Sequence, residues 1–482
     1  MKRLIDFSKG LLLGLARRRL VRSIGRRLVT PGMRRGPEKY ILEALAPEPP
    51  VADDFRTMLS KHAALDAVPG RVVMVCGSLQ PGGAERQVGN TLVGLAGTPS
   101  GIESLTLLCE SLCSKRKERH DFYLPLARES GATIREIRQQ PVGRDKEISA
   151  TLQKTMDKLH PWLAHDVARL YWEFRLLRPQ VVHAWLDWCN VRAGLAAMLA
   201  GVPRVLLSGR NLSPRHFALN TDYFQPAYRA LVEQEDGRLI LLNNSQAGAD
   251  DYSTWLGVRG DRIKVIRNGV RFTDEVHPAA HHAGAFRAQL GIPPTVPLIG
   301  GMFRFNDEKR PLLWLRVAAR IAEALPEARF VLFGQGDMRS QMEHLIEKLG
   351  IGPRIYLCGV ISQSLAGLAP CDLILLTSRG EGTPNVLLEA QWLGLPVVTT
   401  DAGGAAEAVN DGITGRVVRS DEEADLADAV LSILRDRAFR ATARREGPVF
   451  ISYKYGMARM IDETLTAYGL LSPAGHPEGA LT

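Results

Sequence analysis

The sequence predicts an α/β protein built of two doubly wound domains that face each other across a cleft. Short apolar runs alternate with longer stretches of helical periodicity, a pattern typical of parallel sheets covered on both faces. The alternation stops over residues 273–297, which are rich in proline and histidine, and then starts again. The length of 482 residues also exceeds that of one ordinary domain.

The expected strands are the apolar runs themselves. In the first half they cover residues 72–76, 105–109, 134–137, 181–184, 205–208, 239–242 and 264–266, with helices such as 84–96 and 191–200. In the second half we expect strands at 298–303, 329–333, 355–358, 373–377 and 397–400, and helices at 308–324, 337–349 and 384–393. Ligands of such sheets bind outside the carboxyl ends of the strands, so the loops there are the first places to look for a site.

These patterns divide the chain into six segments. Residues 46–54 (APEPPVADD) are rich in proline and acid and are typical of a linker, so order should begin near Arg71. The predicted segments are a basic extension with linker (1–68), an N-terminal domain (69–275), an interdomain linker (276–297), a C-terminal domain (298–450), a helix packing back toward the N-terminal domain (451–470) and a disordered tail (471–482).

The positive charge is concentrated at the start of the chain. Residues 1–35 hold eleven Lys or Arg against one acid, Asp6, so this arm accounts for the whole net charge of +9. A nucleic-acid-binding surface would spread basic residues over a folded face, so that function is not indicated. The six cysteines have neither disulfide-scaffold nor zinc-site spacing, which favours reduced cysteines in a cytoplasmic protein.

The basic arm has two interpretations. No stretch reaches the roughly 18–20 apolar residues of a membrane-spanning helix, and the short run 11–16 is a poor signal peptide. The arm could lie on an anionic membrane surface, which would place the protein peripherally on the inner face of the plasma membrane. It could equally be a solvated arm.

The segment SRGEGTPNVLLE (378–389) carries the strongest site pattern. It follows the apolar run 373–376, with Thr383 placed as the N-cap of a helix and Pro384 at its first position. The free N–H groups of such a helix start attract phosphate. Glu381 and Glu389 could hold sugar hydroxyls beside it; the alternative is a pair of ordinary surface carboxylates.

Two further loops follow strands of the same half. Arg304 and Lys309 in FRFNDEKRP would suit a diphosphate, or would simply be a basic helix start. Gly403 and Gly404 in DAGGAAE allow a tight turn and close approach of backbone to a ligand.

Together these segments resemble the retaining glycosyltransferases of family four, which have the GT-B fold of two Rossmann-like domains. The resemblance covers residues 71–470. It rests on the E-x7-E pair (Glu381, Glu389), the R-x4-K pair (Arg304, Lys309), the G-x-G loop (Gly334, Gly336), the NGV turn at 268–270, the GGAAE turn and the glycine-rich loop LQPGGAERQ with Gly82 and Gly83.

The resemblance implies a role for each matched position. Arg304 and Lys309 would bind the diphosphate of a UDP- or GDP-sugar, Glu381 a hydroxyl of the transferred sugar and Glu389 the ribose. No catalytic metal or other cofactor is implied. The N-terminal domain would bind the acceptor and the C-terminal domain the donor. The remaining candidates are, for the donor, Gly382, Thr383, Pro384, Asn385, Gly334, Gly403 and Gly404, and, for the acceptor and phosphate loop, Gly82, Gly83, Glu85, Arg86, Asp187 and Arg210.

The chain departs from the family pattern after residue 182. Where many relatives have VHxH, this chain has VHAW, so His183 fills the first histidine position and Trp185 the second. His183 is therefore either a catalytic candidate or a core histidine with satisfied hydrogen bonds.

The resemblance predicts transfer of a sugar, with retention of configuration, from a nucleotide sugar to a glycan, glycolipid or polyprenyl-linked acceptor in bacterial cell-surface polysaccharide biosynthesis. The alternative is an inactive scaffold or nucleotide-sugar-binding subunit of the same fold. A sugar-nucleotide epimerase is disfavoured by the intact Glu381 and Glu389 pair.

Overall fold

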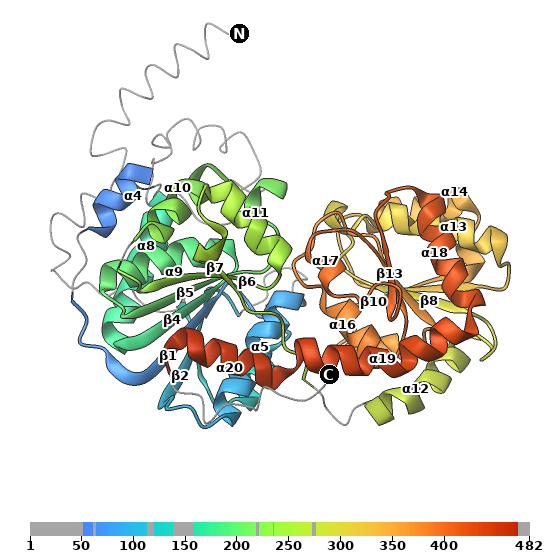
Figure 1. The fold of residues 1–482 in the computed structure, drawn as a ribbon, viewed down its shortest axis with the longest axis horizontal. Coiled ribbons are helices and arrows are strands. Elements are labelled where there is room, and N and C mark those ends of the chain that lie inside the picture. The colour runs from blue at the N-terminus through green and yellow to red at the C-terminus, as the bar shows by residue number, and fades with distance from the viewer. Residues whose placement is uncertain are drawn as a thin grey trace, which may run out of the picture.

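The protein consists of two α/β domains, each built on a parallel sheet (Figure 1). The structure is a computed structural model, and it describes residues 52–60, 64–112, 120–137, 156, 159, 161–217, 221–234, 236–271 and 276–470. The predicted fold class, two doubly wound domains, is confirmed. The basic arm (1–35) and the tail (471–482) lie outside the described residues. Within the described ranges, the structure has no helix of the length and apolar character needed to cross a membrane.

The N-terminal sheet has seven strands in the order β3-β2-β1-β4-β5-β6-β7. Its strands are β1 (Val68–Cys76), β2 (Ser104–Cys109), β3 (Thr133–Glu136), β4 (Pro179–Trp185), β5 (Arg204–Gly209), β6 (Leu239–Asn243) and β7 (Ile263–Val265). The helices are α5 (Gly83–Gly97), α6 (Leu124–Glu129), α8 (Pro161–Leu177), α9 (Asp187–Ala200), α10 (Thr221–Val232) and α11 (Gln246–Leu256), with 3-10 turns η2 (Pro214–His216) and η3 (Gly260–Arg262). Both faces of the sheet are covered, which explains the nearly continuous apolar strands.

Helix α4 (Ala52–Leu59) was not expected from the sequence, which predicted a linker over residues 46–54 and order from Arg71. Its residues Phe55, Met58 and Leu59 are buried and belong to the N-terminal core, packed against α9 and α10. The spacing of these three residues places them on one helical face. Two of the acidic residues that suggested a linker, Asp53 and Asp54, instead occupy the first turn of this helix, where negative charge is favourable.

The C-terminal sheet has six strands in the order β10-β9-β8-β11-β12-β13. They are β8 (Leu298–Met302), β9 (Arg329–Phe333), β10 (Ile355–Gly359), β11 (Leu373–Leu376), β12 (Val397–Thr400) and β13 (Gly415–Val418), the last of which the sequence did not predict. The helices are α13 (Pro311–Ala324), α14 (Arg339–Leu349), α15 (Ser364–Leu368), α16 (Asn385–Trp392), α17 (Gly404–Glu407), α18 (Glu423–Arg435) and α19 (Arg437–Tyr455), with 3-10 turns η4 (Asp307–Lys309) and η5 (Gly352–Arg354).

The segment predicted as the interdomain linker (276–297) contains helix α12 (Val276–Gln289), which lies against α15 in the C-terminal domain. Arg287 fixes this position because its buried guanidinium donates to Pro370 O at 2.8 Å and to Asp372 Oδ2 at 2.8 Å. Of the prolines that suggested a linker, Pro278 lies within α12. It does not prevent this helix because proline is tolerated in the first turn of a helix.

The chain crosses between the domains a second time near its end. Helix α19 packs on α16 and α18 of the C-terminal domain, and α20 (Met457–Tyr468) follows it along the side of the molecule onto the N-terminal domain (Figure 1). Met460, Ile461, Leu465 and Tyr468 of α20 are part of the N-terminal core. This second crossing lies beside the segment around Val270 at the end of the N-terminal domain, since Val270 N donates to Tyr455 O at 2.8 Å.

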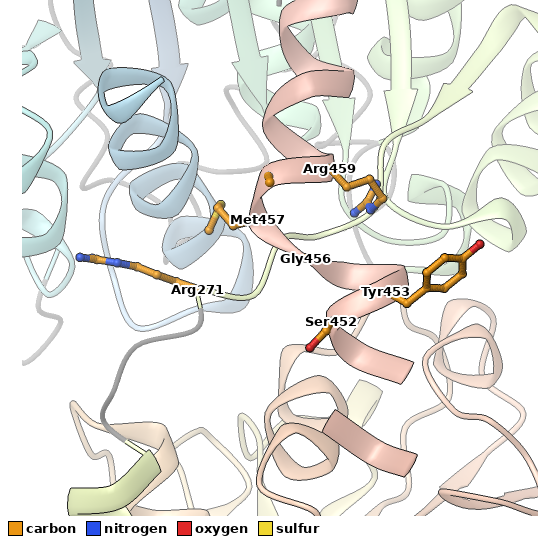
Figure 2. A pocket seen from close by; sticks show the side chains of 7 residues that line it. Arg271, Ser452, Tyr453, Gly456, Met457 and Arg459 are labelled. Carbon is orange, nitrogen blue, oxygen red and sulfur yellow. The ribbon is translucent and has the colours of Figure 1, made fainter. Parts of the chain in front are cut away.

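A surface pocket opens where α19 meets α20 (Figure 2). It is lined by Arg271, Ser452, Tyr453, Gly456, Met457, Ala458 and Arg459. None of the candidate residues from the sequence lines it. This pocket is therefore a feature of the crossing between the domains rather than of the predicted site.

Candidate functional site

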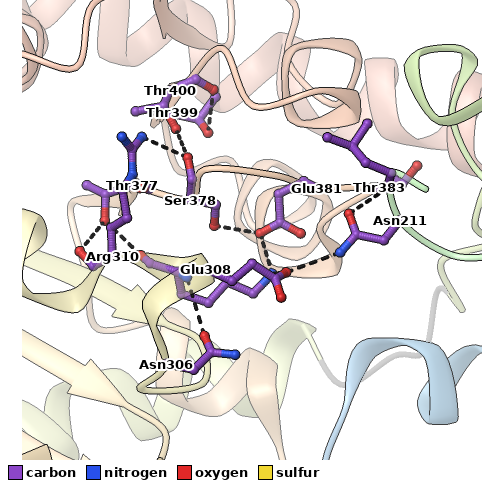
Figure 3. A network of polar contacts seen from close by, with 12 residues as sticks. Asn211, Asn306, Glu308, Arg310, Thr377, Ser378, Glu381, Thr383, Thr399 and Thr400 are labelled. Carbon is purple, nitrogen blue, oxygen red and sulfur yellow. Dashed lines mark hydrogen bonds and ion pairs between the residues drawn. The ribbon is translucent and has the colours of Figure 1, made fainter. Parts of the chain in front are cut away.

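Lys309 meets Glu381 at the carboxyl edge of the C-terminal sheet, and Figure 3 shows Glu381 among its polar neighbours Ser378 and Glu308. Lys309 lies in the turn after β8, where Asn306 Oδ1 accepts a hydrogen bond from Lys309 N and caps η4. Its Nζ donates to Glu381 Oε1 at 2.8 Å and to Glu308 Oε1 at 2.9 Å. Burial alone would lower the pKa of Lys309, but the two carboxylates outweigh it and raise the pKa, so the ammonium stays charged.

Glu381 is held by its backbone as well as by its side chain. The residue is only 7% exposed, and its carboxylate also accepts from Ser378 Oγ at 2.6 Å. Its carbonyl accepts from Gly404 N at 3.0 Å, so the two loops predicted separately form one unit. A Cβ at Gly404 would lie 2.0 Å from Gly382 O, and one at Gly403 would lie 2.8 Å from Glu381 O. These two glycines therefore make room for the neighbouring loop of the protein itself.

The glycines of the G-x-G loop, Gly334 and Gly336, also make room for a neighbouring loop of the protein. A Cβ at Gly334 would lie 1.9 Å from Phe303 O, and one at Gly336 would lie 2.3 Å from Phe305 O. Phe305 N donates to Gln335 O at 2.9 Å, which binds the loop after β8 to the loop after β9. These glycines position the segment that carries the R-x4-K pair.

Arg304 extends toward the N-terminal domain. Its side chain is 51% exposed and lies 3.9 Å from Glu85 Oε1, measured from Nη2. Glu85 is buried in the first turn of α5, beside the N-cap Gly82. Asn385 Nδ2 donates to Gly83 O at 3.0 Å across the same boundary. The glycine-rich loop thus borders the Arg304 side of the predicted donor site.

Glu389 lies on α16, and its side chain contacts the N-terminal domain. The residue is 7% exposed and its carboxylate forms an ion pair with Arg86 of α5, while Arg86 Nη1 donates to Ser364 Oγ at 2.8 Å. Burial raises the pKa of Glu389 although Arg86 acts in the opposite direction. Among the residues that the structure describes, Glu389 Oε2 has no hydrogen-bond partner, so this carboxylate retains an acceptor for a ligand hydroxyl.

The predicted cap of α16 is wrong. Pro384 occupies the N-cap position and no side chain of the described residues caps the helix, so Thr383 is one residue too early to serve. Thr383 Oγ1 instead donates to Asn244 O at 2.6 Å, and Thr383 O accepts from Asn268 Nδ2 at 3.0 Å. Thr383 therefore joins the two domains, and the helix start keeps the uncapped N–H groups that were expected there.

His183 is a core residue in this structure. It is 2% exposed, and its ring nitrogens lie 2.9 Å from Tyr468 Oη and 2.7 Å from Ser208 Oγ. Burial first, and the nearby Arg210 second, lower the pKa of His183 to about 3, so the imidazole is neutral. Of the two interpretations offered by the sequence, the geometry matches the satisfied core histidine, because both nitrogens already have partners.

Asp187 is likewise turned into its own domain. It accepts hydrogen bonds from Tyr228 Oη at 2.8 Å and Tyr252 Oη at 2.5 Å. Burial raises the pKa of Asp187 against the effect of these two hydroxyls. The predicted acceptor role of Asp187 finds no support in this arrangement, whereas Arg210 lies over Trp185 close to the domain boundary.

Sequence reasoning missed several residues that join the domains. Glu407 accepts from Gln246 N at 3.0 Å and Ala247 N at 2.7 Å, so a carboxylate of the C-terminal domain caps α11 of the N-terminal domain. Glu407 ends the GGAAE motif, which was the available signal. Asn268 begins the NGV turn, and Glu308 lies inside the R-x4-K segment and accepts from Asn211 Nδ2 at 3.1 Å.

Residues 283–449 match the family model described as Glycosyl transferases group 1. This segment is thus similar to a group 1 glycosyltransferase domain. The matched segment contains Arg304, Lys309, Glu381 and Glu389, so the Lys309–Glu381 pair lies wholly within it.

Two groups of relatives extend beyond the matched segment. The chain is 30% identical over 390 residues to the Vi polysaccharide biosynthesis protein VipC/TviE of Salmonella typhi, covering 76% of this chain and 66% of the relative. It is 35% identical over 190 residues to D-inositol 3-phosphate glycosyltransferase of Nocardia farcinica, covering 38% of this chain and 42% of the relative. The match thus spans less than two thirds of the length of either relative.

Solved structures share the two-domain fold. Alr3699/HepE of Anabaena, in complex with UDP and glucose, is 20% identical with a TM-score of 0.64, covering 83% of this chain and 99% of that one. Sucrose-phosphate synthase of Thermosynechococcus elongatus is 16% identical with a TM-score of 0.61, covering 83% and 98%. At this identity the likeness establishes the fold, and the segment that matches the family model is the C-terminal half of a GT-B arrangement.

Proposed function

We propose that this chain is a retaining glycosyltransferase that transfers a sugar from a UDP- or GDP-sugar to a glycan, glycolipid or polyprenyl-linked acceptor in cell-surface polysaccharide biosynthesis. The observation that carries the proposal is the 2.8 Å contact between Lys309 Nζ and Glu381 Oε1 inside the segment that matches the family model. The pair places a fixed cation and a hydroxyl-binding carboxylate together at the ligand-binding edge of the sheet. The relative named for Vi polysaccharide biosynthesis supports the polysaccharide setting.

Each side chain of the site has a physical role in such a transfer. Lys309 and Arg304 would stabilise the negative charge that develops on the departing nucleoside diphosphate. Glu381 would accept a hydrogen bond from a hydroxyl of the transferred sugar, and Glu389 from the ribose. The free Oε2 of Glu389 allows this contact to form beside Arg86.

We also propose that the reaction needs no catalytic metal or other cofactor. Arg304 and Lys309 would each direct a cationic group at the diphosphate, which is the kind of electrostatic contribution that a divalent cation makes in other phosphate sites. Metal independence can be measured directly, by comparing turnover in EDTA with turnover in added Mg²⁺ or Mn²⁺.

The first experiment is a thermal-shift screen of the purified chain against UDP-, GDP-, ADP- and CDP-sugars. A ligand that binds only the folded state raises its stability, by about 2.7 kcal/mol at a hundredfold excess over the dissociation constant. We expect a clear shift with one nucleotide class. A shift with none of them would contradict the proposed donor site, and binding without turnover would favour the scaffold alternative.

Turnover of the donor then tests the residues. Lys309→Ala and Glu389→Ala should each reduce donor turnover, Lys309→Ala by about 10²–10³-fold because a preorganised charge at the leaving group is lost. Lys348→Ala is the matched control, since Lys348 is exposed on α14 of the same domain. Wild-type turnover in a folded Lys309→Ala protein would remove the site assignment.

A further inference from the structure

Arg210 and Trp185 form a stacked pair at the carboxyl edge of the N-terminal sheet. Trp185 is the last residue of β4, and Arg210 directly follows β5, the neighbouring strand in the sheet. The guanidinium carbon of Arg210 lies 4.5 Å from the centroid of the indole ring. A planar guanidinium stacked on an aromatic ring keeps its N–H edges available for hydrogen bonds.

Some hydrogen-bond donors of Arg210 and Trp185 have no acceptor among the described residues. Arg210 Nη2 donates to Asn268 Oδ1, but Arg210 Nε is buried and has no acceptor in the part of the chain that the structure describes. The same is true of Trp185 Nε1, which is buried in a residue that is 2% exposed and has no acceptor within the described ranges. Two buried donors left open in one stacked pair are costly in a folded protein unless a ligand supplies the acceptors.

The charge of Arg210 is also uncompensated. No carboxylate among the residues that the structure describes forms an ion pair with it, and burial lowers its pKa to about 9. Arg192 of the same domain shows the opposite arrangement, because Glu110 and Asp166 both pair with it and outweigh burial to raise its pKa. A buried cation without a counter-charge is destabilising, and an arriving anion would remove that penalty.

The pair lies beside the donor loop of the other domain. Asn268, which accepts from Arg210, donates to Thr383 O at 3.0 Å and to Asn385 Oδ1 at 2.7 Å. A Cβ at Gly382 would lie 2.5 Å from Arg210 O, so the backbone after Glu381 touches the backbone of Arg210. Arg210 therefore stands on the N-terminal side of the domain boundary, opposite the loop that carries the proposed sugar contact.

We propose that Arg210, stacked on Trp185 and held by Asn268, binds an anionic group of the acceptor, a carboxylate or a phosphate. Arginine pairs with both groups through charge-assisted hydrogen bonds, and the bound oxygen atoms would give Arg210 Nε the acceptor that the protein lacks. The assignment of the anion to the acceptor rests on the proposed function, in which the donor occupies the C-terminal domain. The acceptor class is then an acidic sugar or a phosphate-bearing sugar or lipid.

The test compares charged and neutral sugars of the same size. Glucuronate, glucose 6-phosphate and glucose are titrated calorimetrically into the full chain in the presence of saturating UDP. We expect at least one of the two anions to bind at least tenfold more tightly than glucose. Arg210→Gln should abolish this preference and leave UDP affinity unchanged, whereas Arg259→Gln, a change at an 84% exposed arginine of the same domain, should alter neither.

The outcomes separate the possible sources of the anion. Preference for glucuronate alone indicates a carboxylate, and preference for glucose 6-phosphate alone indicates a phosphate. Equal affinity of the wild type for all three sugars overturns the proposal, and this comparison does not depend on whether Arg210→Gln folds. An equal loss of UDP affinity in Arg210→Gln also overturns it, because Arg210 would then serve the donor diphosphate. Failure of the wild type to bind any nucleotide contradicts the proposed function instead.

Discussion

The buried imidazole of His183 makes the stability of the N-terminal domain depend on pH in a calculable way. In the folded protein its pKa is lowered to about 3 from an ordinary value of 6.5, chiefly by burial. The unfolded chain therefore binds a proton at this residue over a range in which the folded chain does not. Stability that is present above pH 6.5 is lost as the pH falls toward 3.

The size of the effect follows from the two pKa values. At pH 5 the unfolded imidazole is almost fully protonated and the folded one is almost fully neutral, which costs about 2 kcal/mol relative to pH 7. His183→Gln removes this proton linkage. It also weakens the contacts with Tyr468 and Ser208, which lowers the free energy of unfolding by about 1–3 kcal/mol. The variant should thus be less stable than the wild type at pH 7 and nearly equal to it at pH 5.

The assay is urea unfolding at both pH values, followed by deuterium uptake of peptides from β4, which report on the domain that holds His183. Groups common to both proteins titrate equally and cancel when wild type and variant are compared. The reasoning would be refuted by a loss of stability between pH 7 and pH 5 that is the same in both proteins. Such a result would mean that His183 can be protonated without disturbing the fold.

Three further changes probe features that the sequence did not settle. Phe55→Ala in α4 should destabilise the N-terminal domain by about 3–5 kcal/mol in urea unfolding, whereas Tyr453→Ala, at an aromatic residue 85% exposed, should change stability by less than about 0.5 kcal/mol. Gly404→Ala should cost about 1–3 kcal/mol because its methyl group would collide with backbone, while Gly260→Ala meets open space and should melt like the wild type. Deleting residues 1–35 should abolish binding to vesicles containing anionic lipid in a sedimentation assay, and a wild-type chain that leaves such vesicles unbound would disprove a membrane role for the arm.

The Lys309–Glu381 site could be predicted because its determinants are local. Both residues lie in loops that directly follow strands of one sheet, and parallel topology brings those loops to the same edge. The strands themselves are apolar runs bounded by glycine, proline and polar residues, which is a strong local signal.

Contacts between distant segments could not be predicted in this way. The partner of Glu389 is Arg86 on the other domain, and their meeting depends on how the domains are placed. The decisive partner of His183 is Tyr468, which lies 285 residues away. Helix α4 was missed for a different reason: its apolar spacing was visible, but only eight residues carry it beside a proline-rich stretch.

The position of α20 has a consequence for how the protein is made. Met460, Leu465 and Tyr468 complete the N-terminal core, yet they are among the last described residues to leave the ribosome. Domains generally fold as units during synthesis, the N-terminal one first. The N-terminal domain emerges first, but its core is complete only after α20 has been translated. A stop codon or a proteolytic cut a few residues before 457 would therefore damage the N-terminal domain, although that domain lies farthest from the cut in sequence.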